Sequence, residues 1–312
     1  MTEDYGLTKQ EYRKLIEDST SKASEIAKII NTPKKIYRFR RFGSDDGLNW
    51  NESKHWREDV DGICMFSKPD SFNKNDSEDC RVRFDEELVF QYMLKQIEKD
   101  LNRCVNDQSE LRIRKCFIPK LVVYKDSLQS NMRVGCFTAA GPLDIGMWND
   151  SNFGDKGRGL CIEYNVDNEN FRPDGLAFLP VLYDDLPYDN TNAMKTVIDF
   201  LCTHSVDAAI KLVCLGYGHT LIKPLRYENE REWRLVIPLR DDNAHMDYFT
   251  ANKESKRDMC SAIIAMYLGP NIDELAEFNK FKEAVFNTGT KLNIPIYQIV
   301  KEKDSLKKVL LA

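Results

Sequence analysis

Short apolar runs of strand length recur at irregular intervals along this chain of 312 residues and alternate with longer helical patterns. Strand patterns occupy residues 36–40, 63–67, 120–124, 133–138, 159–164, 178–183, 233–239, 262–268 and 294–300. Helical patterns, with apolar residues near the 3.6-residue period, cover residues 85–101, 193–215 and 273–286. A doubly wound parallel sheet requires strand and helix to follow each other regularly, and this chain lacks that rhythm. The pattern therefore predicts an α+β fold.

The N-terminal segment has a helical pattern of its own. Thr8 and Glu11 have the spacing of a capping box, which satisfies backbone N–H groups at the start of a helix. Apolar residues from Tyr12 to Ile30 follow at helical spacing, and the pattern ends near residues 31–33. We therefore predict a helical extension over residues 1–33 and a single domain over residues 34–312.

Composition argues against several classes of function. The 50 acidic residues exceed the 45 basic ones, for a formal net charge of −5, whereas binding to nucleic-acid phosphates needs a basic face. The nine cysteines form no C-x-x-C pair and the four histidines lack zinc-binding spacing, so we predict no metal site. The N-terminus is too polar for a signal peptide, and no apolar run approaches the roughly 18 residues that cross a membrane. We therefore expect a cytoplasmic protein without a membrane partner.

Three carboxylates at alternate positions lead directly into an apolar strand pattern. They are Glu228, Glu230 and Glu232. If the strand begins early, Glu230 and Glu232 point to the same side, because side chains two positions apart share a face. Two like charges so close are unfavourable unless a cation or a substrate compensates them. The segment is therefore a candidate for catalytic carboxylates, and the alternative is a solvated, charged loop before a strand.

The strand pattern at residues 36–40 carries two arginines. Arg38 and Arg40 would lie on one face of the strand, and Tyr37 and Phe39 on the other. An arginine held on a strand presents the paired donors that bind a phosphate group. The alternative is an edge strand that its charges keep soluble.

A polar turn follows the second strand pattern. Ser67 ends the strand, Pro69 and Asn73 favour turn geometry, and Phe72 lies between them. A hydroxyl group and an aromatic ring at such a place suit a heteroaromatic ring and its ribose. The alternative is a loop that binds no ligand.

Taken in order, these segments resemble a bacterial family catalogued as domain of unknown function 2971. The motifs that carry the resemblance, spread over residues 36–269, are Tyr37-Arg38-Phe39-Arg40, Phe66-Ser67-Lys68-Pro69, Phe72-Asn73, Asn75-Asp76, Cys136-Phe137-Thr138, Met147-Trp148, Gly159-Leu160-Cys161-Ile162-Glu163-Tyr164 and Glu230-Arg231-Glu232-Trp233-Arg234-Leu235. One departure concerns residues 149–151, which are Asn, Asp and Ser where the family usually has His and Tyr. A role for that His or Tyr does not carry over to this chain. The family name assigns no activity.

A second, looser resemblance is to the Arg-Ser-Glu pattern of ADP-ribosyltransferases. It rests on an arginine on a first strand, a serine that closes a second strand and a Glu-x-Glu before a later strand. That resemblance implies a core of two small, mostly antiparallel sheets around a cleft, flanked by helices, with NAD as the substrate. Arg40 or Arg38 would bind the pyrophosphate or a ribose of NAD, and Ser67 would support its nicotinamide end. Glu232 would be the catalytic carboxylate, and Glu230 would align the acceptor. The aromatic rings available to stack on the cationic nicotinamide are Tyr37, Phe39, Phe72 and Tyr227.

These resemblances imply transfer of ADP-ribose from NAD to an acceptor, in a toxin or phage-defence effector. Its partners would be NAD, an unknown macromolecular acceptor and an antitoxin or other defence-system protein. Neither a metal ion nor a nucleophilic serine is required, because nicotinamide leaves as a neutral molecule and the ribose becomes oxocarbenium-like, as in glycoside hydrolysis. Two alternatives stay open: a catalytically silent member of the fold that binds a nucleotide or a protein, and a NAD glycohydrolase or nuclease that uses the same carboxylates.

Overall fold

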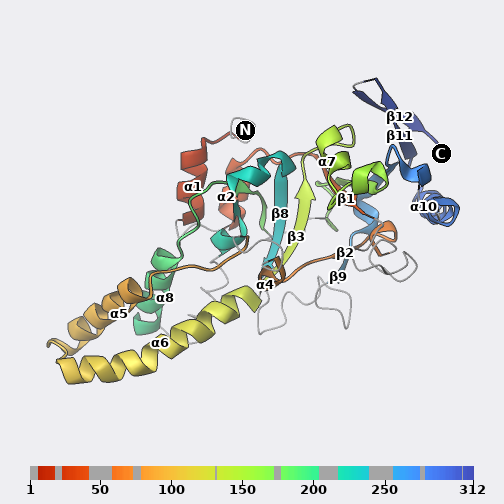
Figure 1. Ribbon diagram of the computed structural model, residues 1–312. Coiled ribbons are helices and arrows are strands. Elements are labelled where there is room, and N and C mark those ends of the chain that lie inside the picture. Colours follow the sequence, from red (N-terminus) through yellow and green to blue (C-terminus); the bar gives the residue numbers. More distant parts are fainter. Residues whose placement is uncertain are drawn as a thin grey trace.

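A single eight-stranded sheet forms the centre of the computed structural model (Figure 1). The structure describes residues 6–17, 23–41, 58–72, 79–130, 132–171, 177–203, 217–238, 256–274, 278–303 and 305–312. In spatial order the strands of this sheet are β12 (Ser305–Leu310), β11 (Ile296–Glu302), β10 (Ile263–Leu268), β4 (Leu160–Asn165), β1 (Lys35–Arg40), β3 (Met132–Thr138), β8 (Glu232–Pro238) and β5 (Ala177–Pro180). Neighbouring strands are antiparallel, except that β10 and β11 are parallel. The prediction of an α+β fold is confirmed.

Helices and two small sheets surround this sheet. The α-helices are α1 (Lys9–Glu17), α2 (Ala23–Ile29), α4 (Pro69–Phe72), α5 (Glu86–Leu101), α6 (Asp107–Ser130), α7 (Ile145–Asn149), α8 (Thr191–Thr203) and α10 (Phe278–Leu292). The 3₁₀ helices are η2 (Asp155–Gly157), η3 (Tyr217–Thr220), η4 (Leu225–Glu230), η6 (Cys260–Ala262) and η7 (Ile272–Glu274). The small sheets are the pairs β2 (Ile63–Met65) with β9 (Lys256–Asp258) and β6 (Leu182–Tyr183) with β7 (Ile222–Lys223).

The main sheet differs from the two small sheets that the ADP-ribosyltransferase resemblance implies. The expected strands join into one sheet because β1 has a partner on each side, β4 along its length and β3 at Tyr37. Three strands, β7, β9 and β12, were not predicted. Two of them have only two or three residues, and β12 is mostly polar or exposed, so none has the apolar alternation of a half-buried strand.

The N-terminal helices α1 and α2 pack on the body of the protein. The predicted capping box is present: the N–H of Thr8 donates to Glu11 at 2.8 Å, and the N–H of Glu11 donates to Thr8 Oγ1 at 3.2 Å. The buried hydroxyl of Tyr12 donates to the carbonyl of Pro180 in β5 at 2.6 Å. Both helices therefore share the hydrophobic core of the sheet, and the domain boundary after residue 33 stays a prediction.

Two hydrophobic cores lie on opposite faces of β1. The main core lies between the sheet and helices α1, α2 and α10, and it buries Ile36 of β1 and Phe281 of α10. The smaller core joins Phe39 of β1 to Trp148 of α7, whose rings meet edge to face with centroids 4.9 Å apart. The side chains of β1 alternate between the two cores, as strand geometry requires.

Helices α5, α6 and α8 form a bundle that projects from the end of the molecule near β5 and β8 (Figure 1). Asp85 caps α5 by accepting from the N–H of Leu88 at 2.9 Å, which confirms the helix predicted at residues 85–101. The bundle has its own apolar cluster, which includes Phe90 of α5 and Leu121 of α6. The helix predicted at residues 193–215 is α8, and residues 204–216 lie outside the described ones.

The strand predicted at residues 120–124 is wrong. These residues belong to α6, a helix of 24 residues that contains Pro119. Phe117 and Leu121 lie one helical turn apart, and both pack into the apolar cluster of the bundle. A preference of valine for strands is small and depends on context, so this packing overrides it.

The other predicted elements are present with shifted ends. The strands predicted at residues 36–40, 133–138, 159–164, 262–268 and 294–300 are β1, β3, β4, β10 and β11. The run at residues 178–183 divides into β5 and β6, and the run at residues 63–67 divides into β2 and an isolated bridge at Ser67. The run at residues 233–239 is β8, and residue 239 lies outside the described residues. The helix predicted at residues 273–286 is η7 followed by α10, and residues 275–277 lie outside the described residues.

Gly135 allows Phe66 to pack against β3. A Cβ atom at Gly135 would lie 2.5 Å from the ring of Phe66, which is fully buried. We therefore expect Gly135→Ala to lower the free energy of unfolding by about 1–3 kcal/mol, because the ring has no room to move. Gly141→Ala is the control, since its Cβ would meet Tyr37 at 3.8 Å, an ordinary contact distance. Urea unfolding of both variants tests this, and equal stability of the two would contradict it.

Candidate functional site

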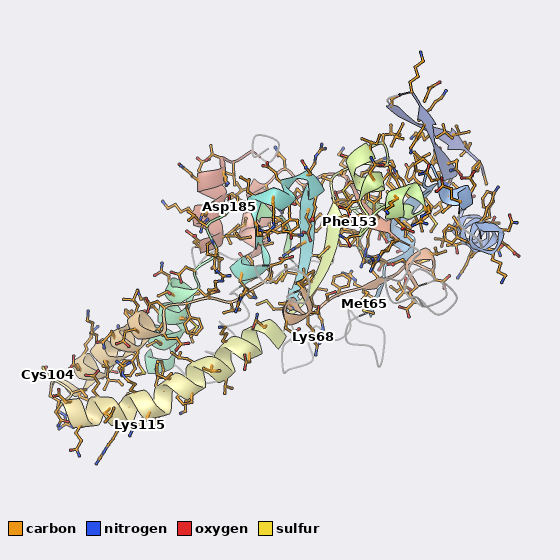
Figure 2. All side chains as sticks on the ribbon, in the orientation of Figure 1. Met65, Lys68, Cys104, Lys115, Phe153 and Asp185 are labelled. Atoms are coloured by element: carbon orange, nitrogen blue, oxygen red, sulfur yellow. The ribbon has the colours of Figure 1, made fainter. Side chains whose placement is uncertain are left out.

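One cavity of about 640 Å³ brings together all of the predicted site residues. They come from β1, the segment after β2, α4, η4 and β8, and they are Tyr37, Arg38, Arg40, Ser67, Phe72, Tyr227, Glu230 and Glu232. Met65 and Phe153, both labelled in Figure 2, line the same cavity. Its volume lies within the range of about 300–1,000 Å³ that is typical of small-molecule sites.

The cavity lies along an open edge of β1. On one side β1 pairs with β4 at six positions. On the other side β1 pairs with β3 at one position, where Tyr37 lies opposite Thr138. Farther along β3, Val134 pairs instead with Ser67, through two backbone hydrogen bonds of 2.9 Å. Because β1 leaves β3 at this point, side chains from both of its faces reach the cavity. They are Tyr37, Arg38, Phe39 and Arg40.

A fully buried arginine organises the wall of the cavity at β8. Arg234 Nε and Nη2 donate to the two oxygens of Glu232 at 2.9 and 3.0 Å. Its Nη1 and Nη2 donate to the two oxygens of Asp79, both at 2.8 Å. Glu232 and Arg234 lie two positions apart in β8 and therefore share a face. The guanidinium thus binds two carboxylates bidentately, the strongest geometry for such pairs.

Lys223 of β7 lies among the carboxylates of this wall. Its Nζ is 2.6 Å from Glu230, 3.4 Å from Glu232 and 3.8 Å from Asp79. With Arg234, the wall holds two cations and three carboxylates. The predicted repulsion between Glu230 and Glu232 is therefore compensated by protein cations.

The two glutamates have opposite pKa shifts. Burial, together with the charge of Glu232, raises the pKa of Glu230 to about 7, although Lys223 opposes this. Burial alone would raise the pKa of Glu232 too, but Arg234 and then Lys223 lower it to about 2. Glu232 is therefore a permanent negative charge, whereas Glu230 is able to take up and release a proton near neutral pH.

The arginines of β1 lie around a buried aspartate. Arg40 Nε is 2.5 Å from Asp59, and Arg38 Nη2 donates to the carbonyl of Met65 at 2.8 Å. Burial alone would lower the pKa of Arg38, but the thiol of Cys64 and the carboxylate of Asp59 raise it, so the guanidinium stays charged. Its Nε and Nη1 are buried and have no hydrogen-bond partner among the described residues.

The predicted aromatic residues have neighbours of their own. The ring of Phe72 lies 5.4 Å from the guanidinium carbon of Arg234, and the ring of Tyr227 lies 4.6 Å from Lys223 Nζ. Burial and then the charge of Glu163 raise the pKa of Tyr37 to about 12, so its hydroxyl stays protonated at neutral pH. Phe72 and Tyr227 therefore already face cations of the protein.

Sequence reasoning assigned no role to Asp79, Lys223 or Arg234. The alternation of Glu232 and Arg234 in one strand is a signal that two opposite charges share a face. Asp79 and Lys223 reach the site through tertiary structure, and no spacing in the sequence indicates them. Tyr183 of β6 also supports the site, because the N–H of Glu232 donates to its hydroxyl oxygen at 2.7 Å.

Two further properties concern the described part of the chain. Its histidine, cysteine and acidic side chains form no group of three or more that is placed to hold a metal ion. Its helices include none with the length and apolar character needed to cross a membrane.

Arg234 should contribute strongly to stability. Arg234→Met would leave Asp79 and Glu232 buried without their main cation, so we expect the free energy of unfolding to fall by about 3–5 kcal/mol. Arg112→Met, at an exposed position of α6, is the matched control and should change it by less than about 0.5 kcal/mol. Urea unfolding measures both, and a small loss for Arg234→Met would contradict the role of this cluster.

The pKa of Glu230 predicts a pH dependence of stability. Folding raises this pKa from 4.5 to about 7, so the folded protein binds the proton more tightly than the unfolded chain does. The stability that protonated Glu230 provides is therefore lost as the pH rises from about 4.5 to about 7. Glu230→Gln removes the titration, so the variant should gain stability relative to the wild type over the same interval. Unfolding free energies at several pH values test this. Glu228→Gln, in the same helix η4, is the control, and the same pH-dependent gain in both variants would contradict the assignment.

No known protein family, curated protein or solved structure matches this chain in comparisons of sequence and structure. The two resemblances therefore stay predictions, and a functional assignment has to be argued from the geometry of the cavity.

Proposed function

We propose that this protein transfers ADP-ribose from NAD to an acceptor in the cavity beside β1. The observation that carries the proposal is Arg38, which lines the cavity and is 6 % exposed. Its Nε and Nη1 have no hydrogen-bond partner among the described residues, although buried donors are almost always satisfied in proteins. A ligand with a strong acceptor would satisfy them, and a phosphate group is an acceptor that arginine binds especially well.

The distribution of charge around the cavity also suits NAD. Arg38 and Arg40 belong to β1, whereas Glu232 begins β8, with β3 between them. Two strand spacings place the backbones of β1 and β8 about 9–10 Å apart. NAD carries its negative charge on the pyrophosphate and a positive charge on the nicotinamide ring. In our proposal the pyrophosphate lies near the arginines of β1 and the nicotinamide riboside near the carboxylates.

The chemistry of the transfer needs only groups that this cavity holds. The bond between C1′ of the ribose and the nicotinamide nitrogen breaks, and its electron pair leaves with nicotinamide as a neutral molecule. A lone pair of the acceptor forms the new bond to C1′, and the acceptor's proton passes to a carboxylate. We assign stabilisation of the oxocarbenium-like ribose to Glu232, whose charge is permanent, and alignment and deprotonation of the acceptor to Glu230.

The sheet supports the proposal of an ADP-ribosyltransferase-like core. Strands β12, β11, β10, β4 and β1 lie on one side of the open edge, and β3, β8 and β5 on the other. The two sets are joined where Tyr37 pairs with Thr138. In our interpretation they correspond to the two small sheets around a cleft, connected into one sheet at this position.

One observation favours the silent alternative, a member of the fold that binds a nucleotide without turning it over. Both oxygens of Glu232 accept hydrogen bonds from Arg234. These bonds compensate the carboxylate and reduce the field that it exerts on a bound ribose. The transferase and the silent binder share the nucleotide site, so they differ in turnover and not in binding.

Label transfer tests the proposal. The purified protein is incubated with NAD labelled in its adenylate phosphate and with a bacterial lysate, and label is counted in macromolecules while free nicotinamide is measured. We expect both products from the wild type. Glu230→Gln should slow the transfer of label to macromolecules about 100-fold, the effect typical of losing a general base, whereas Glu228→Gln should leave it unchanged.

The other outcomes separate the alternatives. Free ADP-ribose without labelled macromolecules would indicate a glycohydrolase. Calorimetric binding of NAD without turnover would indicate the silent binder, and Arg40→Gln should then weaken binding about tenfold, as expected for a charged hydrogen bond. Absence of both binding and turnover in the wild type would overturn the proposal.

A further inference from the structure

We propose that Lys223 is the positioning residue of this site: its ammonium group holds Glu230 and Glu232 side by side in the cavity wall. The inference rests on the proposed function in one respect, that these carboxylates act on a ligand of the cavity. Its structural part does not depend on NAD and is testable without it.

The first reason is the balance of charge. Arg234 already binds Asp79 and Glu232 bidentately, so Glu230 needs another cation. Lys223 Nζ is 2.6 Å from Glu230 and 3.4 Å from Glu232, and its side chain is only 11 % exposed. Close, buried carboxylates repel each other strongly, and an ammonium group between them removes most of that repulsion. Lys223 is therefore the group that allows Glu230 to lie next to Glu232.

The second reason is that the structure fixes the ammonium group from several sides. Strand β7 pairs with β6 so that Lys223 lies opposite Tyr183, whose hydroxyl oxygen accepts from the N–H of Glu232 at 2.7 Å. The ring of Tyr227, in η4, lies 4.6 Å from Lys223 Nζ. The small sheet β6–β7 and η4 thus hold the lysine and the two glutamates in one arrangement. A lysine on an unsupported stem would not position its neighbours in this way.

Loss of this cation has a measurable consequence for Glu230. The charged groups that act on Glu230 are Lys223 from β7, and Glu232 and Arg234 from β8. Without Lys223, the charge of Glu232 and the effect of burial are opposed only by Arg234. The pKa of Glu230, already raised, should rise further, and Glu230 would be protonated at neutral pH and unable to accept a proton.

A carboxyl NMR titration tests the inference directly. The full-length protein is labelled with ¹³C at the glutamate carboxyl carbon, and the Glu230 signal is assigned by its loss in Glu230→Gln. Lys223→Met should raise the titration midpoint of Glu230 by at least about one pH unit, a tenfold gain in proton affinity. Lys223→Arg should retain most of the wild-type midpoint. Lys115→Met, on the projecting helix α6 far from the cavity (Figure 2), is the control and should not move it.

The outcomes distinguish this inference from the proposed function. An unchanged Glu230 midpoint in folded Lys223→Met would overturn the inference, whether or not the protein uses NAD. A wild type that neither binds nor cleaves NAD would overturn the proposed function and leave the titration result standing. If Lys223→Met does not fold, the double variant with Glu230→Gln decides: recovered folding supports the pairing of the two charges, and equal instability contradicts it. Where turnover is measured, its acidic limb should move by the same amount as the midpoint.

Discussion

The burial of Arg234 is the constraint on which the candidate site depends. Its guanidinium has no solvent exposure, so every donor needs a partner within the protein. Asp79 and Glu232 accept at both of their oxygens, and the carbonyl of Thr220 and the thiol of Cys80 accept from Nη1 at 2.7 and 3.0 Å. These partners come from three segments of the chain, residues 79–80, η3 and β8. The polar wall of the cavity therefore forms together with the surrounding core, and its geometry is as fixed as that of the apolar packing behind it.

This arrangement gives two neighbouring glutamates different charge states and different partners. Glu232 is bound on both oxygens by Arg234, which makes it rigid, ionised and partly neutralised. Glu230 ends η4, contacts Lys223 and keeps a proton equilibrium near neutral pH. A carboxylate that must stabilise charge benefits from a fixed position, whereas one that must move a proton benefits from a pKa near the working pH. The different partners of the two residues supply these two properties within one short segment.

Local signals made much of the fold predictable, and tertiary contacts explain the failures. The helix from residue 86 to 101 was predictable because Asp85 caps it and its apolar period is clear. The strand prediction for residues 120–124 failed because a pair of valines locally favours a strand. In the folded chain, the packing of Phe117 and Leu121 in the apolar cluster of the bundle favours the helix. In the site, residues on β1 and β8 were predictable from strand alternation. Tertiary structure alone brings Arg234 to Asp79, which is 155 positions away in the sequence. The same holds for the position of Lys223 beside Glu230.

The open edge of β1 gives some of the motif residues a structural reason that needs no ligand. Backbone groups of β3 that β1 leaves unpaired must find other partners, and Ser67 supplies them at Val134. Gly135 is small because Phe66 packs against it. The ring of Phe66 and the backbone of Ser67 would therefore complete this part of the sheet even in a protein that binds nothing. Arg38 differs from these residues: its buried Nε and Nη1 have no hydrogen-bond partner among the described residues, and Nη1 lies 4.0 Å from Asp59 Oδ1. The geometry of Arg38, more than the motif as a whole, is what indicates an anionic ligand.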